Sequence, residues 1–361
     1  MKIGIVTYHR ANNYGAELQA YALFKYLKNL GYDVEFVDYW PKYHSRIYSI
    51  SGYITRFLLS LKDIRRLFLI FGLPYMCLKL YFKNRRYDLF RKKNMVIGPK
   101  EGDASYDVVF YGSDTIWNNK LNHGFDSMYW GDDKVVAKYK FSYAPSMGNV
   151  IDSEESLNFC KMMLPHFTRI SVREQNLQRK LMEWGWNDVI QVMDPVFLLS
   201  KEQWSEIITP QNCKEDYVLS YNLEKSVVVE DVANQISQKY KIRKISLTGY
   251  VEKSINRNVI DMAGPIEFLR LIENAKYIVT SSFHGVVFSI IFEKQFCFHS
   301  TAETERISSI LDLCNLSNRF VKKANCNIWD EAINYKEVKE RLNVMKRQSY
   351  KYISDCIEYL K

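Results

Sequence analysis

The sequence predicts an α/β protein built from two units, and three observations indicate this fold class. The chain has 361 residues, a length more typical of two domains than of one. Its first forty residues read as a strand, a loop, a helix and a second strand, which is how a parallel sheet opens. A similar alternation begins again near Tyr217. We therefore expect two parallel sheets in succession, each flanked by helices.

The first unit begins with a strand over 2–8, a helix over about 15–30 and a strand over 33–39. Leucines at helical spacing predict the helix, and Gly31 marks its end. Further buried strands are expected at 107–111, 139–144, 170–173 and 189–192. Polar or charged residues follow each of them. Because the carboxyl ends of parallel strands meet at one edge of a sheet, these residues predict a ligand crevice there.

The second unit is expected to hold strands at 217–221, 244–248 and 277–280, with helices over about 229–240 and 265–275 between them. The boundary is placed between Phe197 and Asp216, where prolines interrupt regular structure. A helix around 305–314 and a charged helix over about 335–360 follow. The predicted organisation is an N-terminal domain over 1–200, a C-terminal domain over 201–330 and a last helix within 331–361.

Composition excludes several classes of protein. The chain is 47% hydrophobic and 25% charged, which is typical of a folded globular protein and not of a disordered one. Its seven cysteines form no CxxC pair and no metal-ligand spacing with histidine, so we expect reduced thiols and no metal. The apolar run after Met1 is too short for a signal-peptide core, which predicts a cytosolic protein.

Positive charge is concentrated in residues 41–94, which hold 13 Lys and Arg against two Asp, a local balance of +11. The chain as a whole carries +9, so the remainder carries −2. The segment mixes basic, aromatic and aliphatic residues, and its longest uncharged stretch, 67–78, is shorter than the roughly 20 residues that span a bilayer. We expect a helical insertion in the first domain.

Two interpretations of this insertion stay open. It can lie on an anionic membrane face, at the inner side of the cell membrane, where apolar burial and phosphate attraction add. The basic residues expected to act there are Arg65, Arg66, Arg85 and Arg86. Alternatively it is an ordinary helical excursion that lays its basic side chains along the first domain. No signature of a base-reading module is present, so nucleic acid is not an expected partner.

The segment Ser281-Ser282-Phe283-His284-Gly285 follows a predicted strand and opens a predicted helix. Exposed amides at a helix start, with hydroxyls and an imidazole beside them, can bind a phosphate or a carboxylate. The structural alternative is that a serine caps the helix and His284 is a buried histidine with satisfied hydrogen bonds. We favour the functional interpretation, because the histidine stands at a strand-to-helix turn.

Two more strand ends carry candidate groups. Arg173 can hold an anion through two parallel hydrogen bonds, or it can pair internally with Glu174. Asp114 follows the strand that ends near Gly112 and can accept a hydroxyl proton, with Ser113 beside it. Trp117 can then support the face of a sugar. The alternative is that Ser113 or Asp114 caps a helix and Trp117 belongs to the core.

The first loop lies where an opening strand–helix crevice would place substrate groups. Its candidate hydroxyl-binding residues are His9, Arg10, Asn12, Asn13 and Glu17. Arg306 can add a positive charge to the same cleft, or it can simply begin a solvated helix. No GxGxxG or GxxxxGK[ST] pattern occurs, so neither a dinucleotide fingerprint nor a P-loop is supported.

With these motifs assembled, the sequence resembles the polysaccharide pyruvyl transferase family over nearly its whole length outside the insertion. The resemblance implies two Rossmann-like domains facing one another across a cleft, as in the GT-B glycosyltransferases, with the C-terminal helix returning toward the first domain. The residues that carry it are Asn13-Tyr-Gly-Ala-Glu-Leu-Gln-Ala-Tyr-Ala-Leu23, Gly112-Ser-Asp-Thr-Ile-Trp-Asn118, Tyr143-Ala-Pro-Ser-Met-Gly148, Ser171-Val-Arg-Glu174, Asp194-Pro195 and Ser282-Phe-His-Gly285.

The resemblance also implies an activity. A pyruvyl group would pass from phosphoenolpyruvate, as donor substrate, to a sugar of a cell-surface polysaccharide or its lipid-linked precursor, without metal or cofactor. Arg173 would bind the donor, His284 would bind it or donate a proton, and Asp114 would act on the acceptor hydroxyl. Two alternatives stay open: a GT-B glycosyltransferase that uses a nucleotide sugar, and a non-catalytic, membrane-associated carbohydrate-binding protein.

Overall fold

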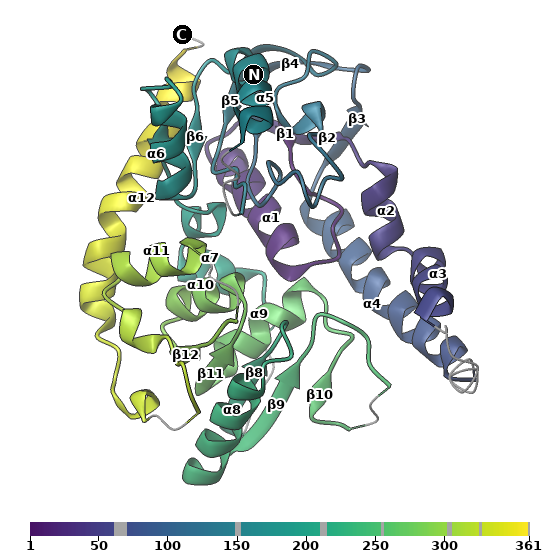
Figure 1. The fold of residues 1–361 in the computed structure, drawn as a ribbon, viewed down its shortest axis with the longest axis vertical. Helices are drawn as coiled ribbons and strands as arrows, with labels where there is room; N and C mark the ends of the chain where they lie inside the picture. The colour runs from purple at the N-terminus through teal and green to yellow at the C-terminus, as the bar shows by residue number, and fades with distance from the viewer. Residues whose placement is uncertain are drawn as a thin grey trace.

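A computed structural model describes residues 1–60, 71–148, 153–209, 215–253, 256–301, 305–324 and 327–359. It contains two five-stranded parallel sheets with the same strand order, the order of a Rossmann fold (Figure 1). The first is β3 (Ile97–Lys100), β2 (Asp33–Asp38), β1 (Lys2–Val6), β4 (Ser105–Tyr111) and β5 (Val136–Ser142). The second is β10 (Val259–Ile260), β9 (Arg243–Leu247), β8 (Tyr217–Tyr221), β11 (Tyr277–Thr280) and β12 (Gln295–Phe298). The predicted fold class, two Rossmann-like domains in the GT-B manner, is confirmed.

The strands β6 (Ser171–Val172) and β7 (Ile190–Gln191) form a short parallel pair beside β5. A backbone bridge between Phe141 and Arg169 joins this pair to the first sheet. Their polar ends are therefore brought to the same edge as those of β1, β4 and β5. Strands β3, β10 and β12 were not predicted from the sequence.

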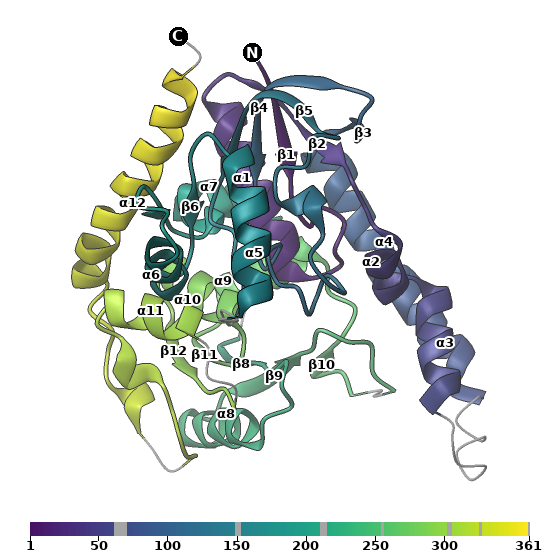
Figure 2. The same ribbon diagram turned by 45° about the horizontal axis from the view of Figure 1, so that its top comes forward.

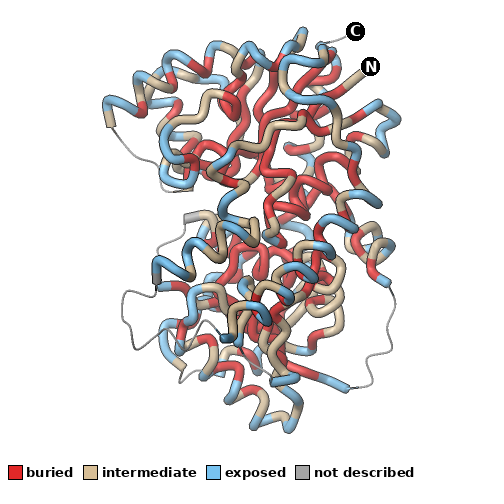
Figure 3. The backbone as a smooth tube through the Cα atoms, turned by 90° about the vertical axis from the view of Figure 1, so that its right-hand side faces the viewer, coloured by how far each residue is buried: buried red, intermediate tan, exposed pale blue. Residues whose placement is uncertain are grey.

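The helices that were predicted are present with small differences at their ends, whereas the helices over 154–163, 175–183 and 201–206 were not predicted. The first, α1 (Tyr14–Asn29), begins one residue earlier than expected because the Asn13 side chain caps it, accepting from the amides of Gly15 and Ala16. The other helices of the two domains are α5 (Glu154–Met163), α6 (Gln175–Glu183), α7 (Lys201–Glu206), α8 (Val227–Tyr240), α9 (Pro265–Asn274), α10 (Phe283–Ile291), α11 (Glu305–Leu313) and α12 (Tyr335–Glu358). Buried residues concentrate in the two sheets and on the inner faces of these helices (Figure 3).

The described part of the basic insertion contains the helices α2 (Lys42–Tyr48), α3 (Ile50–Ser60) and α4 (Leu73–Asn94). Helices α3 and α4 lie side by side and project away from the two sheets (Figures 1 and 2). Across the residues that are described, no helix has both the length and the apolar character needed to cross a bilayer.

One face of α4 is bound to the C-terminal domain. Lys79, almost fully buried, forms an ion pair with Asp261. Lys83 donates to the carbonyl of Gly249 at 2.6 Å, and Arg86 donates to that of Met262 at 3.0 Å. The insertion therefore bridges the two domains, which the sequence alone did not predict.

The last helix, α12, also spans both domains. Near its start, Tyr335 donates to the carbonyl of Lys294 in the C-terminal domain. Near its end, Ser349 accepts from the amide of Met193 at 2.9 Å, and Tyr352 donates to the carbonyl of Ser142 at 2.8 Å. The domains are thus held together by α4 and α12, in addition to the chain that links the two sheets.

Candidate active site

The end of β4 turns sharply and presents Asp114. The turn requires glycine at position 112, because its φ is +134° and a Cβ there would lie 2.1 Å from the carbonyl oxygen of Tyr143. Asp114 is half-buried, and its Oδ1 accepts from the amide of Thr115 at 2.8 Å. No described residue donates a hydrogen bond to its other oxygen, Oδ2. One carboxylate oxygen thus remains available to a substrate hydroxyl.

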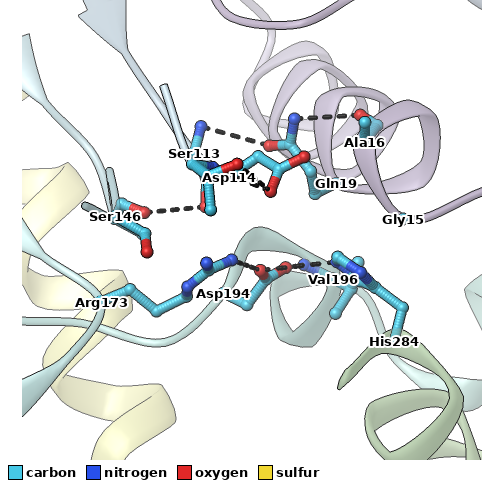
Figure 4. A network of polar contacts seen from close by, with 12 residues as sticks. Gly15, Ala16, Gln19, Ser113, Asp114, Ser146, Arg173, Asp194, Val196 and His284 are labelled. Atoms are coloured by element: carbon cyan, nitrogen blue, oxygen red, sulfur yellow. Dashed lines mark hydrogen bonds and ion pairs between the residues drawn. The ribbon is translucent and has the colours of Figure 1, made fainter. Parts of the chain in front are cut away.

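Arg173 and Asp194 meet at the ends of β6 and β7 (Figure 4). The buried guanidinium of Arg173 donates from Nε to Glu174 Oε1 at 2.9 Å and from Nη1 to Asp194 Oδ2 at 2.6 Å. Asp194 is also buried, and its Oδ1 accepts from the amide of Val196 at 3.1 Å. The predicted internal pair with Glu174 is therefore present, and a second carboxylate completes it.

His284 reaches this network from the C-terminal domain. It lies in the first turn of α10, which Ser282 caps, and its Nε2 is 3.7 Å from Asp194 Oδ2. Figure 4 shows Arg173 and His284 on opposite sides of Asp194. The imidazole also packs against Gly15 of α1 so closely that a Cβ at position 15 would lie 1.9 Å from Nδ1. Helix starts from the two domains therefore touch at this histidine.

A second arginine adjoins the first. The guanidinium carbon of Arg173 lies 5.0 Å from the centroid of the Phe283 ring, and that of Arg306, at the start of α11, lies 5.6 Å from the same centroid. Such distances are those of cation–π contacts. No described residue accepts a hydrogen bond from Arg306. Two positive groups are thus held beside one aromatic ring at the domain boundary.

The charges of these groups influence one another. Burial would raise the pKa of Asp194, but the His284 imidazole and the Arg173 charge outweigh it and lower the pKa to about 2. Burial would lower the pKa of Arg173, but Glu174, Asp194 and Asp114 raise it. For Arg306, burial and the charge of Arg173 lower the pKa. Arg173 and Asp194 therefore form an ionised pair, and Asp114 is close enough to influence both arginines.

Three buried polar atoms of this network have no hydrogen-bond partner among the described residues: Arg173 Nη2, Glu174 Oε2 and His284 Nε2. A cavity of about 40 Å³ adjoins Arg173 and Glu174, and Asp194, Phe283 and Arg306 also line it; His284 does not. A cavity of this volume holds a few water molecules. Because an unsatisfied buried donor is costly, these atoms indicate a place where solvent or a ligand completes the hydrogen bonds.

Ser113 and Trp117 face protein. Ser113 is fully buried; its hydroxyl donates to the carbonyl of Ala144 at 2.8 Å, and its amide donates to Gln19 at 3.2 Å. Trp117 is 1% exposed, stacks on Trp130 and donates to the carbonyl of Tyr129 at 2.9 Å. Trp117 therefore fits the structural alternative, in which it belongs to the core and does not support a sugar. The other part of that alternative is wrong, because no described helix begins at Ser113 or Asp114 for either side chain to cap.

The first loop is likewise engaged within the protein. His9 is fully buried, stacks on Phe36 and lies 3.7 Å from Asp38, and Arg10 pairs with the same carboxylate at 2.6 Å. The buried Glu17 accepts from Arg91 of α4 at 3.0 and 3.1 Å. Two asparagines complete the loop. Asn12 bonds to Asn84 and to Arg91, and Asn13 caps α1.

The predicted site residues next to His284 also make their contacts within the protein. Ser281 accepts from the amides of Leu223 and Glu224, which fixes the loop after β8. Ser282 caps α10. Gly285 packs on Thr280, whose Oγ1 would lie 2.3 Å from a Cβ at position 285. Of the residues predicted for the site, the structure brings together Asp114, Arg173, His284 and Arg306, while the others hold the scaffold around them.

Two residues of the network were not among the predicted site residues. Asp194 lies between Arg173 and His284 and contacts both. The Phe283 ring packs against the guanidinium groups of Arg173 and Arg306. The signal for Asp194 was an acid directly after a predicted strand and before a proline. Phe283 gave no signal apart from its place next to His284. Within the described ranges, no group of three or more His, Cys, Asp or Glu is arranged to hold a metal ion.

The paired Rossmann-like sheets and the charged groups at their boundary define a GT-B-fold protein with an anion-binding candidate site between its domains. The chain belongs to the polysaccharide pyruvyl transferase family, whose sequence model matches residues 13–300. The motifs that carried the resemblance lie within that range. No curated protein matches the chain significantly.

Several solved structures are similar to the chain. The UDP-GlcNAc 2-epimerase of Methanocaldococcus jannaschii in complex with UDP-GlcNAc and UDP is 13% identical, with 99% of this chain and 100% of that one covered at a TM-score of 0.44. The UDP-N-acetylglucosamine 2-epimerase from Rickettsia bellii is 10% identical, with 99% and 97% covered at a TM-score of 0.47. The E. coli heptosyltransferase WaaC with ADP is 10% identical, with 85% and 89% covered at a TM-score of 0.38.

Proposed function

We propose that the chain transfers the pyruvyl group of phosphoenolpyruvate to two hydroxyls of one sugar, in a cell-surface polysaccharide or its lipid-linked precursor, as a ketal. Membership of the family supports this reaction class. The observation that carries the donor assignment is that Arg173 and Arg306 both lie against the Phe283 ring, and that Arg173 Nη2 has no hydrogen-bond partner in the described part of the chain. Phosphoenolpyruvate has a carboxylate and a phosphate, and guanidinium groups bind both.

The reaction needs an acid, a base and a stabilised leaving group. The methylene carbon of the donor gains one proton, two bonds form between its C2 and the sugar oxygens, and the bond from C2 to the phosphate oxygen breaks. Of the two hydroxyl protons released, one balances the proton taken up by the methylene carbon and the other leaves with phosphate. The protein must therefore move protons and neutralise the charge on the departing phosphate.

We assign these tasks to four side chains. Arg173 and Arg306 hold the anionic groups of the donor and the leaving phosphate. His284, placed beside Asp194, donates the proton to the methylene carbon. Asp114, with one carboxylate oxygen free of described hydrogen-bond donors, accepts the proton of an acceptor hydroxyl. None of these assignments involves a metal or a cofactor.

The test is a thermal-shift titration of the purified chain with phosphoenolpyruvate, beside UDP-, GDP- and CMP-linked sugars. A ligand that binds the folded state raises the melting temperature. We expect phosphoenolpyruvate to raise it and Arg306→Met to abolish that rise. Arg306 is suited to this test because it makes no hydrogen bond to a described residue, so its loss should leave the fold intact. Arg270→Met, a half-buried arginine of α9, is the matched control and should keep the response.

Three results would contradict the proposal. A shift with a nucleotide sugar and none with phosphoenolpyruvate favours a glycosyltransferase. An equal loss of response in Arg306→Met and Arg270→Met means that the arginine pair is not the donor site. Binding of saccharides without any donor, and without phosphate release when phosphoenolpyruvate is added, favours a carbohydrate-binding protein.

A further inference from the structure

The exposed face of α4 carries a continuous stripe of large side chains. We call Phe71, Tyr75, Leu78, Phe82, Arg85, Leu89 and Lys92 the arm stripe. They recur every four and three residues, so they lie along one side of the helix and the turn before it. All seven are exposed, and Phe71 is 90% exposed. A contiguous apolar surface of this kind marks an interaction site.

The opposite face of α4 prevents the stripe from turning inward. Its buried residues are Met76, Lys79, Lys83, Tyr87 and Phe90. Lys79 pairs with Asp261, and Lys83 donates to the carbonyl of Gly249. The helix is thus fixed to the body of the protein along its length, and the arm stripe stays on the outside.

Apolar and basic residues are separated along the stripe. The end near Phe71 is apolar through Phe82, whereas the end near the body carries Arg85 and Lys92, with Lys93 beside them. Neither Arg85, Lys92 nor Lys93 forms an ion pair with a described residue. At 1.5 Å per residue, the apolar part of the stripe is about 16 Å long.

From this arrangement we propose that the α3–α4 arm docks on an anionic membrane surface, with the apolar end of the stripe at the acyl boundary and its basic end among the phosphates. Interfacial helices bury an apolar face to about 5–10 Å, which an obliquely lying arm of this length can reach. The arm projects from the two sheets (Figure 2), and all seven residues of the arm stripe are exposed. Docking does not depend on the reaction that the cleft performs.

The charge of the arm favours a membrane over a second copy of the chain as the partner. The described part of the insertion, residues 41–60 and 71–94, holds ten Lys and Arg against one acid, Asp88. Two copies that met stripe to stripe in parallel would bring Arg85, Lys92 and Lys93 close to their like-charged equivalents, which is unfavourable. An antiparallel pair would instead place these charges beside the partner's apolar end, where nothing compensates them. Anionic lipid instead compensates these charges while apolar side chains enter the boundary.

Not all basic residues predicted for this role are available to it. Arg86 donates to Met262 and lies 3.5 Å from Glu267. Arg85 remains exposed. Arg65 and Arg66 lie outside the described residues. One face of the insertion thus packs on the rest of the protein, as in an ordinary helical excursion, whereas its outer face keeps basic residues that can contact a membrane.

The experiment is co-sedimentation of the full chain with vesicles of phosphatidylcholine alone and of phosphatidylcholine mixed equally with phosphatidylglycerol. We expect binding to the anionic vesicles only, weakening as salt rises. Arg85→Gln/Lys92→Gln/Lys93→Gln should weaken binding on the order of 100-fold, from about fivefold per basic residue. Leu78→Ser/Phe82→Ser should also lose binding, since apolar burial is removed.

Matched controls remove the same kinds of group elsewhere. Lys322→Gln/Lys323→Gln/Arg347→Gln removes three exposed charges, and Val227→Ser/Val344→Ser removes two exposed apolar side chains. Both should sediment like the parent chain, and all variants should melt like it. The proposal is overturned if the arm variants bind as well as the controls, if no anionic vesicle binds the chain, or if Leu78→Ser/Phe82→Ser dissociates a dimer instead. A thermal shift with phosphoenolpyruvate is measured on the arm variants as well. A variant that loses vesicle binding but keeps this shift shows that membrane docking and the proposed function are tested independently.

Discussion

Gly15 is the position at which one added methyl group tests the contact between the two domains most directly. In Gly15→Ala the new Cβ would lie 1.9 Å from Nδ1 and 2.3 Å from Cε1 of His284, whereas ordinary contact begins near 3.4 Å. The imidazole, or the helix start that carries it, must therefore move by about 1.5 Å. That displacement separates His284 from Asp194, which it now approaches at 3.7 Å.

The magnitude follows from two opposing effects. Alanine is favoured over glycine in a helix by about 1 kcal/mol, so without the contact the substitution would stabilise α1. Overpacking costs roughly 1–3 kcal/mol, and a displacement of this size belongs at the upper end. We expect a net loss of about 2 kcal/mol. If His284 is the proton donor, a misplacement on the order of 1 Å lowers turnover about 100-fold.

The assay is thermal unfolding of Gly15→Ala, His284→Ala and the double variant, with phosphate release from phosphoenolpyruvate as the activity readout. His284→Ala makes room for the methyl group, so the double variant should melt no lower than His284→Ala alone. A Gly15→Ala protein that melts at or above the parent temperature with full turnover would refute the close contact and the role of His284 together.

Three further predictions concern the scaffold and the charges around the site. The pKa of Asp194 is about 2 in the folded chain and 3.8 when unperturbed, so its ionised form stabilises the fold by about 2 kcal/mol above pH 4, and this contribution is lost as the pH falls from about 4 toward 2. Urea unfolding across that pH range should show a flatter profile for Asp194→Asn, and an unchanged profile would count against the assignment. Asp261→Leu leaves the charge of Lys79 buried without its partner and should lower the free energy of unfolding by about 3–5 kcal/mol. Adding Lys79→Met in a double variant should restore most of that loss. Urea unfolding measures both variants, and no recovery in the double variant would mean that the lost ion pair does not cause the destabilisation. Trp117→Phe should destabilise the chain by about 1–3 kcal/mol, because the ring is in the core. The thermal shift with phosphoenolpyruvate should stay unchanged. A stable variant with altered saccharide affinity would instead support a sugar-binding role for Trp117.

The part of the site that could be predicted from the sequence is the part that a parallel sheet brings together. Asp114 follows β4 of the first sheet, Arg173 follows β6 of the short pair beside it, and His284 follows a strand of the second sheet. Each position therefore depends on local sequence and on a general rule of the fold. The partners of these residues could not be predicted. Glu17 is bound by Arg91, 74 residues away, and that pairing depends on how the insertion packs.

The same limit explains the short strands that were missed. Strands β3 and β10 have four and two residues, too few for a pattern of alternation, and each is an edge strand of its sheet. Trp117 illustrates the reverse case. Its position after a strand end is typical of a substrate-facing residue, but a stacking partner, Trp130, removes it from the surface. Burial by a distant partner is decided by tertiary packing, which a local pattern does not contain.

The two faces of α4 share one repeat length, and this constrains how the arm can change in evolution. Its buried positions are spaced by three, four, four and three residues, and its outer positions are spaced by four and three residues in turn, so both sets have the same average spacing. Adding or removing one residue would rotate the outer face by about 100° relative to the domain contacts. A change of seven residues nearly preserves the orientation and alters the reach of the arm by about 10 Å. Homologues that keep this architecture are therefore expected to differ in arm length by multiples of seven residues.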